Sequence, residues 1–324
     1  MDLVRIAKAP AKLAALAGQL GRHEGGRNAI SYLKRLGISH ADAVDIAKNL
    51  KKWASPIESF QRAQTAAYLA GGAADEPRVP RDKDYLHVPD GYLEGTDRVV
   101  RHCAELFRRK ENDLRANFKP PYGMVIKFSQ ENRRDQMEDP EEIRPILEFA
   151  AQPKFFRILT DYIGEFPVMS TVSLIYTEPN SDTIGPQQFH RDMNERRQLH
   201  FVMPIWPIDM ETGPFTFLPG DRSSDVVRAL RDTGAGRISD EMIFSECRDD
   251  ELVRITGKPG DVFLVNPYRC IHFGARARSK PRLILIVNFT SLFEGAEGLG
   301  AVYRSENRYV LNDGRTETRW LLNI

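Results

Sequence analysis

The C-terminal half of the chain alternates between hydrophobic and polar positions with the period of a β-strand. The segment 282–291, RLILIVNFTS, repeats with a period of two. One predicted face carries Arg282, Ile284, Ile286, Asn288 and Thr290, and the other carries Leu283, Leu285, Val287 and Phe289. Both faces are largely apolar, so we predict a strand that is buried on both sides. Upstream, residues 257–267 predict a turn and a short apolar strand, followed by a loop that carries His272.

Further strands and helices are predicted around this pair. β-Branched and aromatic residues predict strands over 166–180, over 198–208 and after the Gly-Pro turn of 211–215. Helical spacing predicts a long helix over 95–118, two helices over 141–164, and a short helix with a loop insertion over 225–247. This mixture predicts an α+β fold, with a double-stranded β-helix (a cupin-like jelly roll) buttressed by helices.

The first 80 residues have a different, helical pattern. Ser39 is placed to cap one predicted helix, and Pro56 falls in the first turn of the next. The stretch that follows them is rich in glycine, proline and charge, which indicates a linker. We therefore predict an α-helical N-terminal extension over residues 1–80 and a jelly-roll domain over residues 81–324.

Residues 1–22 are amphipathic, with hydrophobic side chains at helical spacing and basic side chains largely apart from them. Two roles fit this pattern: packing against the domain, which we favour, and contact with a membrane surface. No apolar run approaches the roughly 20 residues that a transmembrane helix needs.

Composition narrows the function without identifying it. The 46 basic and 45 acidic residues give a net charge of +1, so the field of the whole molecule gives no reason to expect nucleic acid as a partner. Hydrophobic residues make up 41% of the chain and charged residues 28%, as in ordinary soluble globular proteins. Three cysteines at unpatterned spacing suit a reducing compartment, which predicts a cytoplasmic location. The oligomeric state is left open.

Candidate metal ligands lie in the segment 187–217. His190 and Asp192 are two residues apart, and residues i and i+2 share one face of a strand, so both can reach one metal ion. His272, 272 − 190 = 82 residues downstream, is a third candidate. Two histidines and one carboxylate leave three positions of an octahedral Fe(II) open, the arrangement of non-haem iron oxygenases. An isolated HxD is also common as a surface ion pair, so both interpretations stand.

Arg282 begins the last predicted strand, 282 − 272 = 10 residues after His272. A guanidinium held away from water without a partner is costly, so we expect an anion beside it. A dicarboxylate co-substrate would supply one through a bidentate pair. Arg276 and Arg278 are rivals for this role, but they fall in the predicted loop.

Taken together, these motifs resemble a known family. The HxD motif, the GPFxxxPG turn of 213–220, PGD before an apolar strand, the distal histidine and the arginine are similar to the phytanoyl-CoA dioxygenase family of Fe(II)/2-oxoglutarate-dependent oxygenases. The resemblance covers about residues 90–290. It implies iron ligands at His190, Asp192 and His272, and an Arg282 that holds the distal carboxylate of 2-oxoglutarate. The chain departs from the family pattern at 219–222, where it has PGDR in place of PGSH, which puts the substrate side in doubt.

Two further residues are expected near the co-substrate. Gln188 shares a strand face with His190, and we expect it either to contact co-substrate or substrate or to make a structural hydrogen bond. Ser173 shares a strand face with Thr171 and Thr177, so one of these hydroxyls is expected to help bind the carboxylate of 2-oxoglutarate.

The resemblance implies a reaction with O2 and a small molecule. The expected outcome is hydroxylation of an unactivated C–H bond of a metabolite or biosynthetic intermediate, with release of succinate and CO2. Basic residues outnumber acids near the predicted mouth, which suggests an anionic substrate; they are Arg191, Arg196, Arg197, Arg222, Arg276 and Arg278. Two other classes stay open: a cupin-like metal enzyme that does not use 2-oxoglutarate, and a non-enzymatic jelly-roll binding protein.

Overall fold

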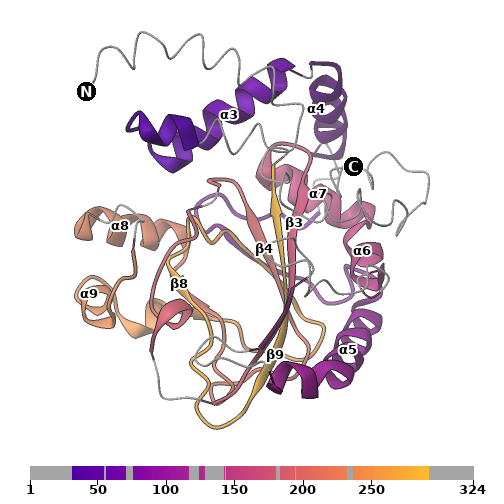
Figure 1. Ribbon diagram of the computed structural model, residues 1–324, viewed down its shortest axis with the longest axis vertical. Helices are drawn as coiled ribbons and strands as arrows, with labels where there is room; N and C mark the ends of the chain where they lie inside the picture. The colour runs from indigo at the N-terminus through magenta and orange to yellow at the C-terminus, as the bar shows by residue number, and fades with distance from the viewer. Residues whose placement is uncertain are drawn as a thin grey trace.

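Two antiparallel sheets form the centre of the computed structural model (Figure 1). The structure describes residues 31–54, 56–70, 76–116, 124–127, 142, 144–179, 183–193, 195–231 and 236–291. The larger sheet has the order β1-β7-β4-β9-β3-β2, formed by β1 (Tyr85–Val88), β7 (Val262–Val265), β4 (Leu199–Pro204), β9 (Arg282–Thr290), β3 (Val168–Thr177) and β2 (Met124–Lys127). The smaller has the order β6-β5-β8, formed by β6 (Val253–Arg254), β5 (Thr216–Phe217) and β8 (His272–Phe273).

The predicted alternation in β9 is confirmed. Leu283, Leu285, Val287 and Phe289 belong to the hydrophobic cluster on the helical side of the larger sheet. Ile284 and Ile286 belong to a second cluster, which also contains Phe217 of β5 and Val253 of β6. That cluster therefore joins the inner faces of the two sheets, and Arg282 and Asn288 share the inward face of β9 with the two isoleucines.

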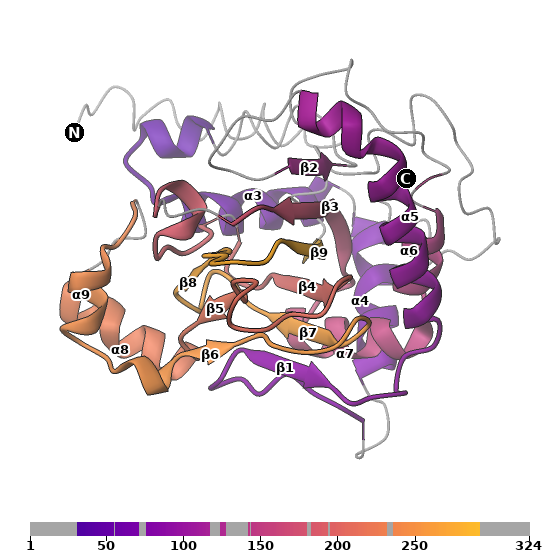
Figure 2. The same ribbon diagram turned by 90° about the horizontal axis from the view of Figure 1, so that it is seen from below.

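Helices cover the outer face of the larger sheet. Figure 2 shows α5 (Thr96–Ala116), α6 (Arg144–Ala150) and α7 (Pro153–Ile163) on the side away from the smaller sheet. The helix α7 begins with Pro153 in its first turn and ends at Gly164, whose φ of 77° is the left-handed conformation that glycine adopts without strain. Its buried face places Phe155 against Phe201 of β4 and Phe289 of β9. Aromatic packing thus fixes the sheet from behind.

Two short helices cover the smaller sheet. They are α8 (Gly220–Leu230) and α9 (Asp240–Phe244), and Ser239 caps α9 by accepting a hydrogen bond from the Met242 N–H. A third cluster contains Val226 and Ile243 of these helices together with Phe189 and Phe273. The helices are therefore anchored to the strand residues that flank His190 and His272.

Two helices, α3 and α4, precede the sheets in the chain. In α3 (His40–Ala54), the Ser39 hydroxyl accepts from the Asp42 N–H at 3.2 Å, so the predicted cap is confirmed. Pro56 opens α4 (Pro56–Ala70), which packs against α7. The prediction for residues 1–22 lies outside the described residues. Within the described part, none of the helices combines the length and apolar character needed to cross a membrane.

The structure corrects two local predictions. His272 was expected in a loop, but it opens β8, where it pairs with Phe217 of β5. The strand is two residues long, so no alternation in the sequence could reveal it. The segment 225–247 was expected to hold a single short helix, but α8 begins earlier, at Gly220, and α9 follows as a second helix.

Candidate metal centre

A pair of backbone hydrogen bonds brings the HxD segment to β8. The His190 N–H donates to the His272 carbonyl at 2.8 Å, and the His272 N–H donates to the His190 carbonyl at 2.9 Å. The Asp192 N–H donates to the carbonyl of Pro267 at 2.9 Å. Two adjacent stretches of backbone are therefore tied together, and their side chains project to one point.

The ligand atoms of the predicted metal site meet in space. One atom from each of His190, Asp192 and His272 lies within 4.8 Å of the others. Nε2 of His190 is 3.6 Å from Oδ1 of Asp192, and Nε2 of His272 is 3.9 Å from Oδ2 of the same carboxylate. The sequence prediction that these three residues come together is thus matched by the geometry.

Both imidazoles are oriented by backbone carbonyls. Nδ1 of His190 donates to the Gln188 carbonyl at 2.8 Å, and Nδ1 of His272 donates to the Cys270 carbonyl at 3.0 Å. A neutral imidazole that donates from Nδ1 has its lone pair on Nε2. Both Nε2 atoms therefore face Asp192 as acceptors, which is the state a metal ligand requires. Gln188 acts here through its carbonyl, which is a different contact from the side-chain role expected of it.

The protonation states suit metal binding. Burial, followed by the charge of His272, lowers the pKa of His190 to about 3. Burial is also the main cause of the lowered pKa of His272. For Asp192, burial opposes ionisation, but the neighbouring imidazoles, His272 first, outweigh it and hold the pKa below its usual value. At neutral pH the site therefore presents two neutral imidazoles and one carboxylate, so little proton release would accompany metal binding.

A third imidazole, which sequence reasoning read as an ordinary strand residue, lies beside the site. His200 is on β4, directly across from Asn288 of β9, and its Nε2 is 3.7 Å from Oδ2 of Asp192. Its Nδ1 is buried and makes no hydrogen bond with the described residues. The signal that could have identified it was a histidine at an inward position of an otherwise apolar strand.

Arg282 is a buried cation that lacks a carboxylate partner among the described residues. It is 3% exposed, and its Nη1 donates to the Gly213 carbonyl at 3.0 Å. Its Nε makes no hydrogen bond with the described residues, and burial lowers the pKa of the guanidinium to about 9. A guanidinium in this state is a receptor for an anion, because an incoming carboxylate would satisfy both its charge and its free N–H.

A short turn connects Arg282 to the histidine site. Gly213 has φ +74°, and a Cβ there would lie 2.4 Å from the backbone nitrogen of Ala277, so only glycine fits. Two residues later, the ring of Phe215 stacks on His272 with centroids 5.2 Å apart. The GPF turn thus contacts the arginine through its carbonyl and the metal centre through its phenylalanine.

The other residues predicted near the site are Ser173 and the arginines of the predicted mouth. Ser173 lies on β3 opposite Ile286, on the inward-facing side that β3 shares with Arg282 of β9. Its part in co-substrate binding stays a prediction. Several arginines predicted at the mouth are already paired: Arg196 with Asp42 and Asp45, Arg222 with Glu251, and Arg276 with Asp240. Counting charges along the sequence therefore overestimated the free positive charge.

The buried carboxylate of Glu195 links α3 to the loop after Asp192, a contact that sequence reasoning missed. One oxygen accepts from Lys48 of α3 at 2.6 Å, and the other accepts from the Ser291 N–H at 2.9 Å. The loop after Asp192 is therefore held between α3 and the end of β9.

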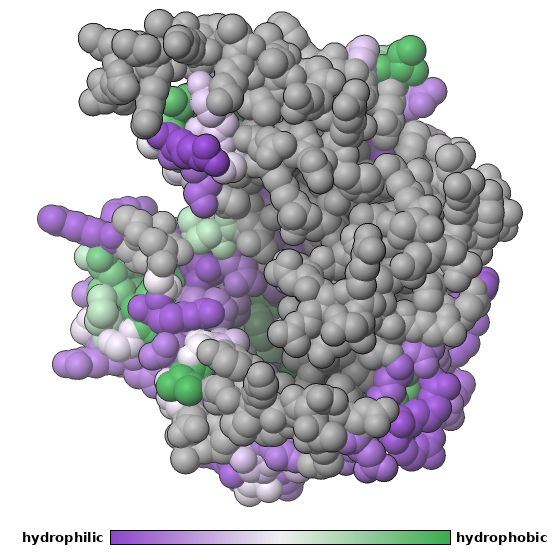
Figure 3. All heavy atoms as spheres, viewed as in Figure 1, coloured by the Kyte–Doolittle hydropathy of each residue, from purple (hydrophilic) through white to green (hydrophobic). Residues whose placement is uncertain are grey.

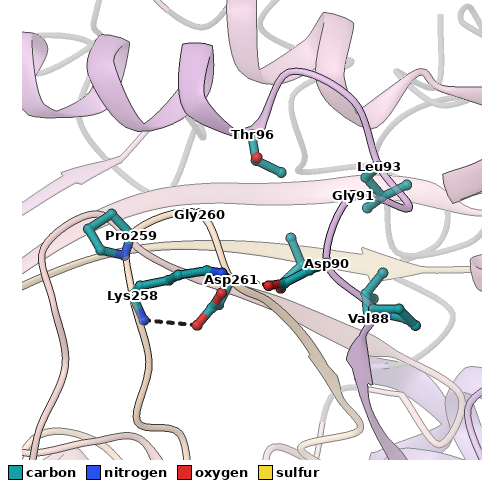
Figure 4. Close-up of a pocket in the computed structure, with 11 residues that line it drawn as sticks. Val88, Asp90, Gly91, Leu93, Thr96, Lys258, Pro259, Gly260 and Asp261 are labelled. Carbon is teal, nitrogen blue, oxygen red and sulfur yellow. Dashed lines mark hydrogen bonds and ion pairs between the residues drawn. The ribbon is translucent and has the colours of Figure 1, made fainter.

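A second group of ligand-type side chains lies elsewhere. His87, Asp90 and Asp261 also bring ligand atoms within 4.8 Å of one another. Asp90 and Asp261 line a surface pocket (Figure 4). Nζ of Lys258 is 2.5 Å from Oδ2 of Asp90, and the Lys258 N–H donates to Asp261. Nζ of Lys258 thus already pairs with Asp90, one of the two carboxylates of this group, and the His190 site is the better candidate for a metal.

No protein-family model and no curated protein matches this chain. Among solved structures, EctD from S. alaskensis with 2-oxoglutarate and 5-hydroxyectoine is 16% identical over 68% of this chain and 79% of its own, with a TM-score of 0.45. HygX from Streptomyces hygroscopicus, with nickel and 2-oxoglutarate bound, is 15% identical over 67% and 89%, with a TM-score of 0.44. The non-haem α-ketoglutarate-dependent epimerase SnoN, from nogalamycin biosynthesis, is 17% identical over 71% and 84%, with a TM-score of 0.41. With TM-scores below 0.5, these likenesses do not decide what this chain does.

Proposed function

We propose that this protein is a non-haem Fe(II)- and 2-oxoglutarate-dependent dioxygenase with a jelly-roll core. The observation that carries the proposal is the meeting of His190, Asp192 and His272, with both Nε2 atoms turned to the carboxylate. Two imidazoles and one carboxylate on one side of a metal ion are the ligand set of Fe(II) oxygenases, and they leave positions for co-substrate and O2. The motif resemblance to the phytanoyl-CoA dioxygenase family agrees with this proposal.

Arg282 supports 2-oxoglutarate as the co-substrate. The guanidinium is buried beside the turn that also contacts His272, and burial alone accounts for its lowered pKa. A metal enzyme that bound its substrate directly would have no need of such a cation. A dicarboxylate with one end at the metal and the other at Arg282 satisfies both.

The roles of the residues follow from their contacts. His190, Asp192 and His272 would hold the metal, and the carbonyls of Gln188 and Cys270 keep the two imidazoles in the binding tautomer. Bound Fe(II) with 2-oxoglutarate supplies the oxidative chemistry, in which O2 converts 2-oxoglutarate to succinate and CO2 and places one oxygen atom in a substrate C–H bond. Arg282 would orient the co-substrate, and the apolar inner faces of the sheets would exclude water.

We also propose that the chain is divided into two parts. Residues 81–324 would form the catalytic domain, and residues 1–80 would form a helical extension. The contact from Lys48 to Glu195 supports a role for that extension in fixing the ligand loop.

Isothermal titration of 2-oxoglutarate into anaerobic protein, with and without Fe(II), tests the proposal. We expect binding that requires the metal and is lost in both His190→Ala and Arg282→Ala. Arg278→Ala is the matched control, because Arg278 is exposed and lies in the segment just before β9. Metal binding without 2-oxoglutarate binding would favour a cupin-like enzyme of another type. Failure of both would leave a jelly-roll binding protein.

A further inference from the structure

We propose that Arg237 forms a second anion-binding subsite beside the metal centre, which takes a carboxylate or phosphate group of the prime substrate. The inference rests on the proposed function and specifies its substrate class. Arg237 was not among the arginines expected at the mouth from the sequence.

The backbone places Arg237 next to His190. Phe189 and Ile238 form an antiparallel bridge, and the Ile238 N–H donates to the Phe189 carbonyl at 2.8 Å. In an antiparallel pair, the residue after Phe189 lies across from the residue before Ile238, so His190 and Arg237 are cross-strand neighbours.

The same bridge decides which way the two side chains face. Phe189 and Ile238 are both buried in the hydrophobic cluster under α8 and α9. Successive side chains of an extended segment point to opposite sides. His190 and Arg237 therefore share the side opposite that cluster, which is the side of Asp192 and His272.

The charge of Arg237 reaches each candidate ligand. Burial has the largest effect on the pKa of His190, Asp192 and His272, but Arg237 also acts to lower all three. Its positive charge is therefore close enough to act on a molecule bound at the metal.

Arg237 is also available for a ligand. It is exposed, and its guanidinium makes no ion pair or hydrogen bond with the described residues. The carboxylate of Asp240, three residues away, is occupied on both oxygens by Arg276, at 2.7 and 2.8 Å. In Figure 3 the surface is hollowed between α3 and the region of α8 and α9, and hydrophilic side chains gather in the hollow. A ligand at the candidate metal centre would therefore lie beside a cation that has no partner among the described residues.

A second cation implies a second anion. Under the proposed function, Arg282 binds the distal carboxylate of 2-oxoglutarate, and it lies on β9 of the larger sheet. Arg237 is thus left for the prime substrate, whose anionic group would fix the position of the carbon to be oxidised. The shared chemistry is a planar fork that binds two oxygens of a carboxylate or a phosphate.

Calorimetry on the full chain, anaerobic and saturated with Fe(II) and 2-oxoglutarate, tests this subsite because Arg282 is then occupied. The probes are butyl phosphate, pentanoate and the neutral analogue pentanol. We expect saturable binding of at least one anion and none of pentanol, and the choice between the two anions identifies the substrate group. Arg237→Gln should weaken the anion about ten- to hundred-fold, the loss of one charge-assisted pair. Arg237→Lys should retain part of the affinity, and Arg278→Gln should leave it unchanged.

The affinity for 2-oxoglutarate separates this inference from the proposed function. If 2-oxoglutarate binds wild type and Arg237→Gln equally, the co-substrate site stands and only the anion probes report on Arg237. Equal anion affinity in wild type and Arg237→Gln, or no saturable anion binding to wild type, would overturn the subsite. A loss of 2-oxoglutarate binding in Arg237→Gln would also overturn it, since Arg237 would then serve the co-substrate.

Discussion

His190 and His272 exchange two backbone hydrogen bonds, at 2.8 and 2.9 Å, although they are 272 − 190 = 82 residues apart in the sequence. Their rings lie with centroids 4.3 Å apart. Because the main chain makes this contact, folding of the backbone itself brings the two imidazoles together. The candidate ligand set is thus held in place by the backbone, which would reduce the ordering that metal binding has to cause.

Removing the carboxylate should remove metal binding. A metal that binds only the folded state stabilises it by about 2.7 kcal/mol at a hundred times Kd. We expect Fe(II) under anaerobic conditions to raise the melting temperature of the wild type and not that of Asp192→Asn. Asp90→Asn, in the second group, where Lys258 already pairs with Asp90, is the matched control and should respond like the wild type. If Asp90→Asn abolished the shift and Asp192→Asn kept it, the metal would belong to the other group.

Replacing Arg282 with methionine should stabilise the protein and abolish co-substrate binding. The pKa of about 9 shows that folding disfavours the charged form of this side chain. Well-packed hydrophobic residues in place of buried ion pairs often stabilise a protein, by up to about 4 kcal/mol, and a buried charge without a carboxylate partner has no Coulombic gain to lose. Urea unfolding of Arg282→Met without ligand should show the gain, and calorimetry should show no binding of 2-oxoglutarate.

The difference in stability between Arg282→Met and wild type should depend on pH. An unfolded arginine stays protonated at accessible pH, so the cost of burying the charge is present in full below pH 9. It diminishes as pH rises through the folded pKa of about 9, where the buried side chain loses its proton. The stability advantage of Arg282→Met over wild type should therefore shrink above pH 9. An advantage that stayed constant to pH 10.5 would contradict the shifted pKa.

The GPF turn should tolerate no side chain at Gly213. Gly213 and Gly91 share a φ of +74°, but a Cβ at Gly213 would lie 2.4 Å from the Ala277 nitrogen, and at Gly91 nothing lies within 4 Å. Gly91→Ala should therefore cost only the backbone strain, about 1 kcal/mol. Gly213→Ala should cost a further ~1–3 kcal/mol from steric overlap.

The affinity for 2-oxoglutarate should also differ between Gly213→Ala and Gly91→Ala. Because the Gly213 carbonyl accepts from Arg282, Gly213→Ala should also weaken 2-oxoglutarate binding, and Gly91→Ala should not. Equal losses of stability in the two variants would show that the overlap is relieved without disturbing the turn.

The buried thiol of Cys103 should make the protein less stable at high pH. Burial raises its pKa from 9.0 to about 12, so the unfolded chain releases this proton at lower pH than the folded protein does. Between those two values, the free energy of unfolding should fall by about 1.4 kcal/mol per pH unit from this group. Urea unfolding at pH 8 and pH 10.5 should show a steeper loss in wild type than in Cys103→Ala. Parallel slopes for the two proteins would refute the assignment.

Local and periodic signals in the sequence were enough to predict several elements of the structure. The inward and outward faces of β9, the helix now seen as α5, the Ser39 cap and the HxD pair follow from spacing within about 20 residues. The spacing of hydrophobic residues is sufficient to predict these elements, because burial of one face of a strand or helix imposes that spacing on the sequence.

Features that depend on contacts between distant backbone segments became visible only in the folded chain. The two-residue strand β8 exists because it pairs with β5, and residue 237 lies next to His190 in the chain register because Ile238 bridges Phe189. The free charges could not be counted from the sequence, since Asp42 and Asp45 pair with Arg196 across more than a hundred residues. Ion pairs and short bridges leave no period in the chain, because each is formed by two segments that only folding brings together.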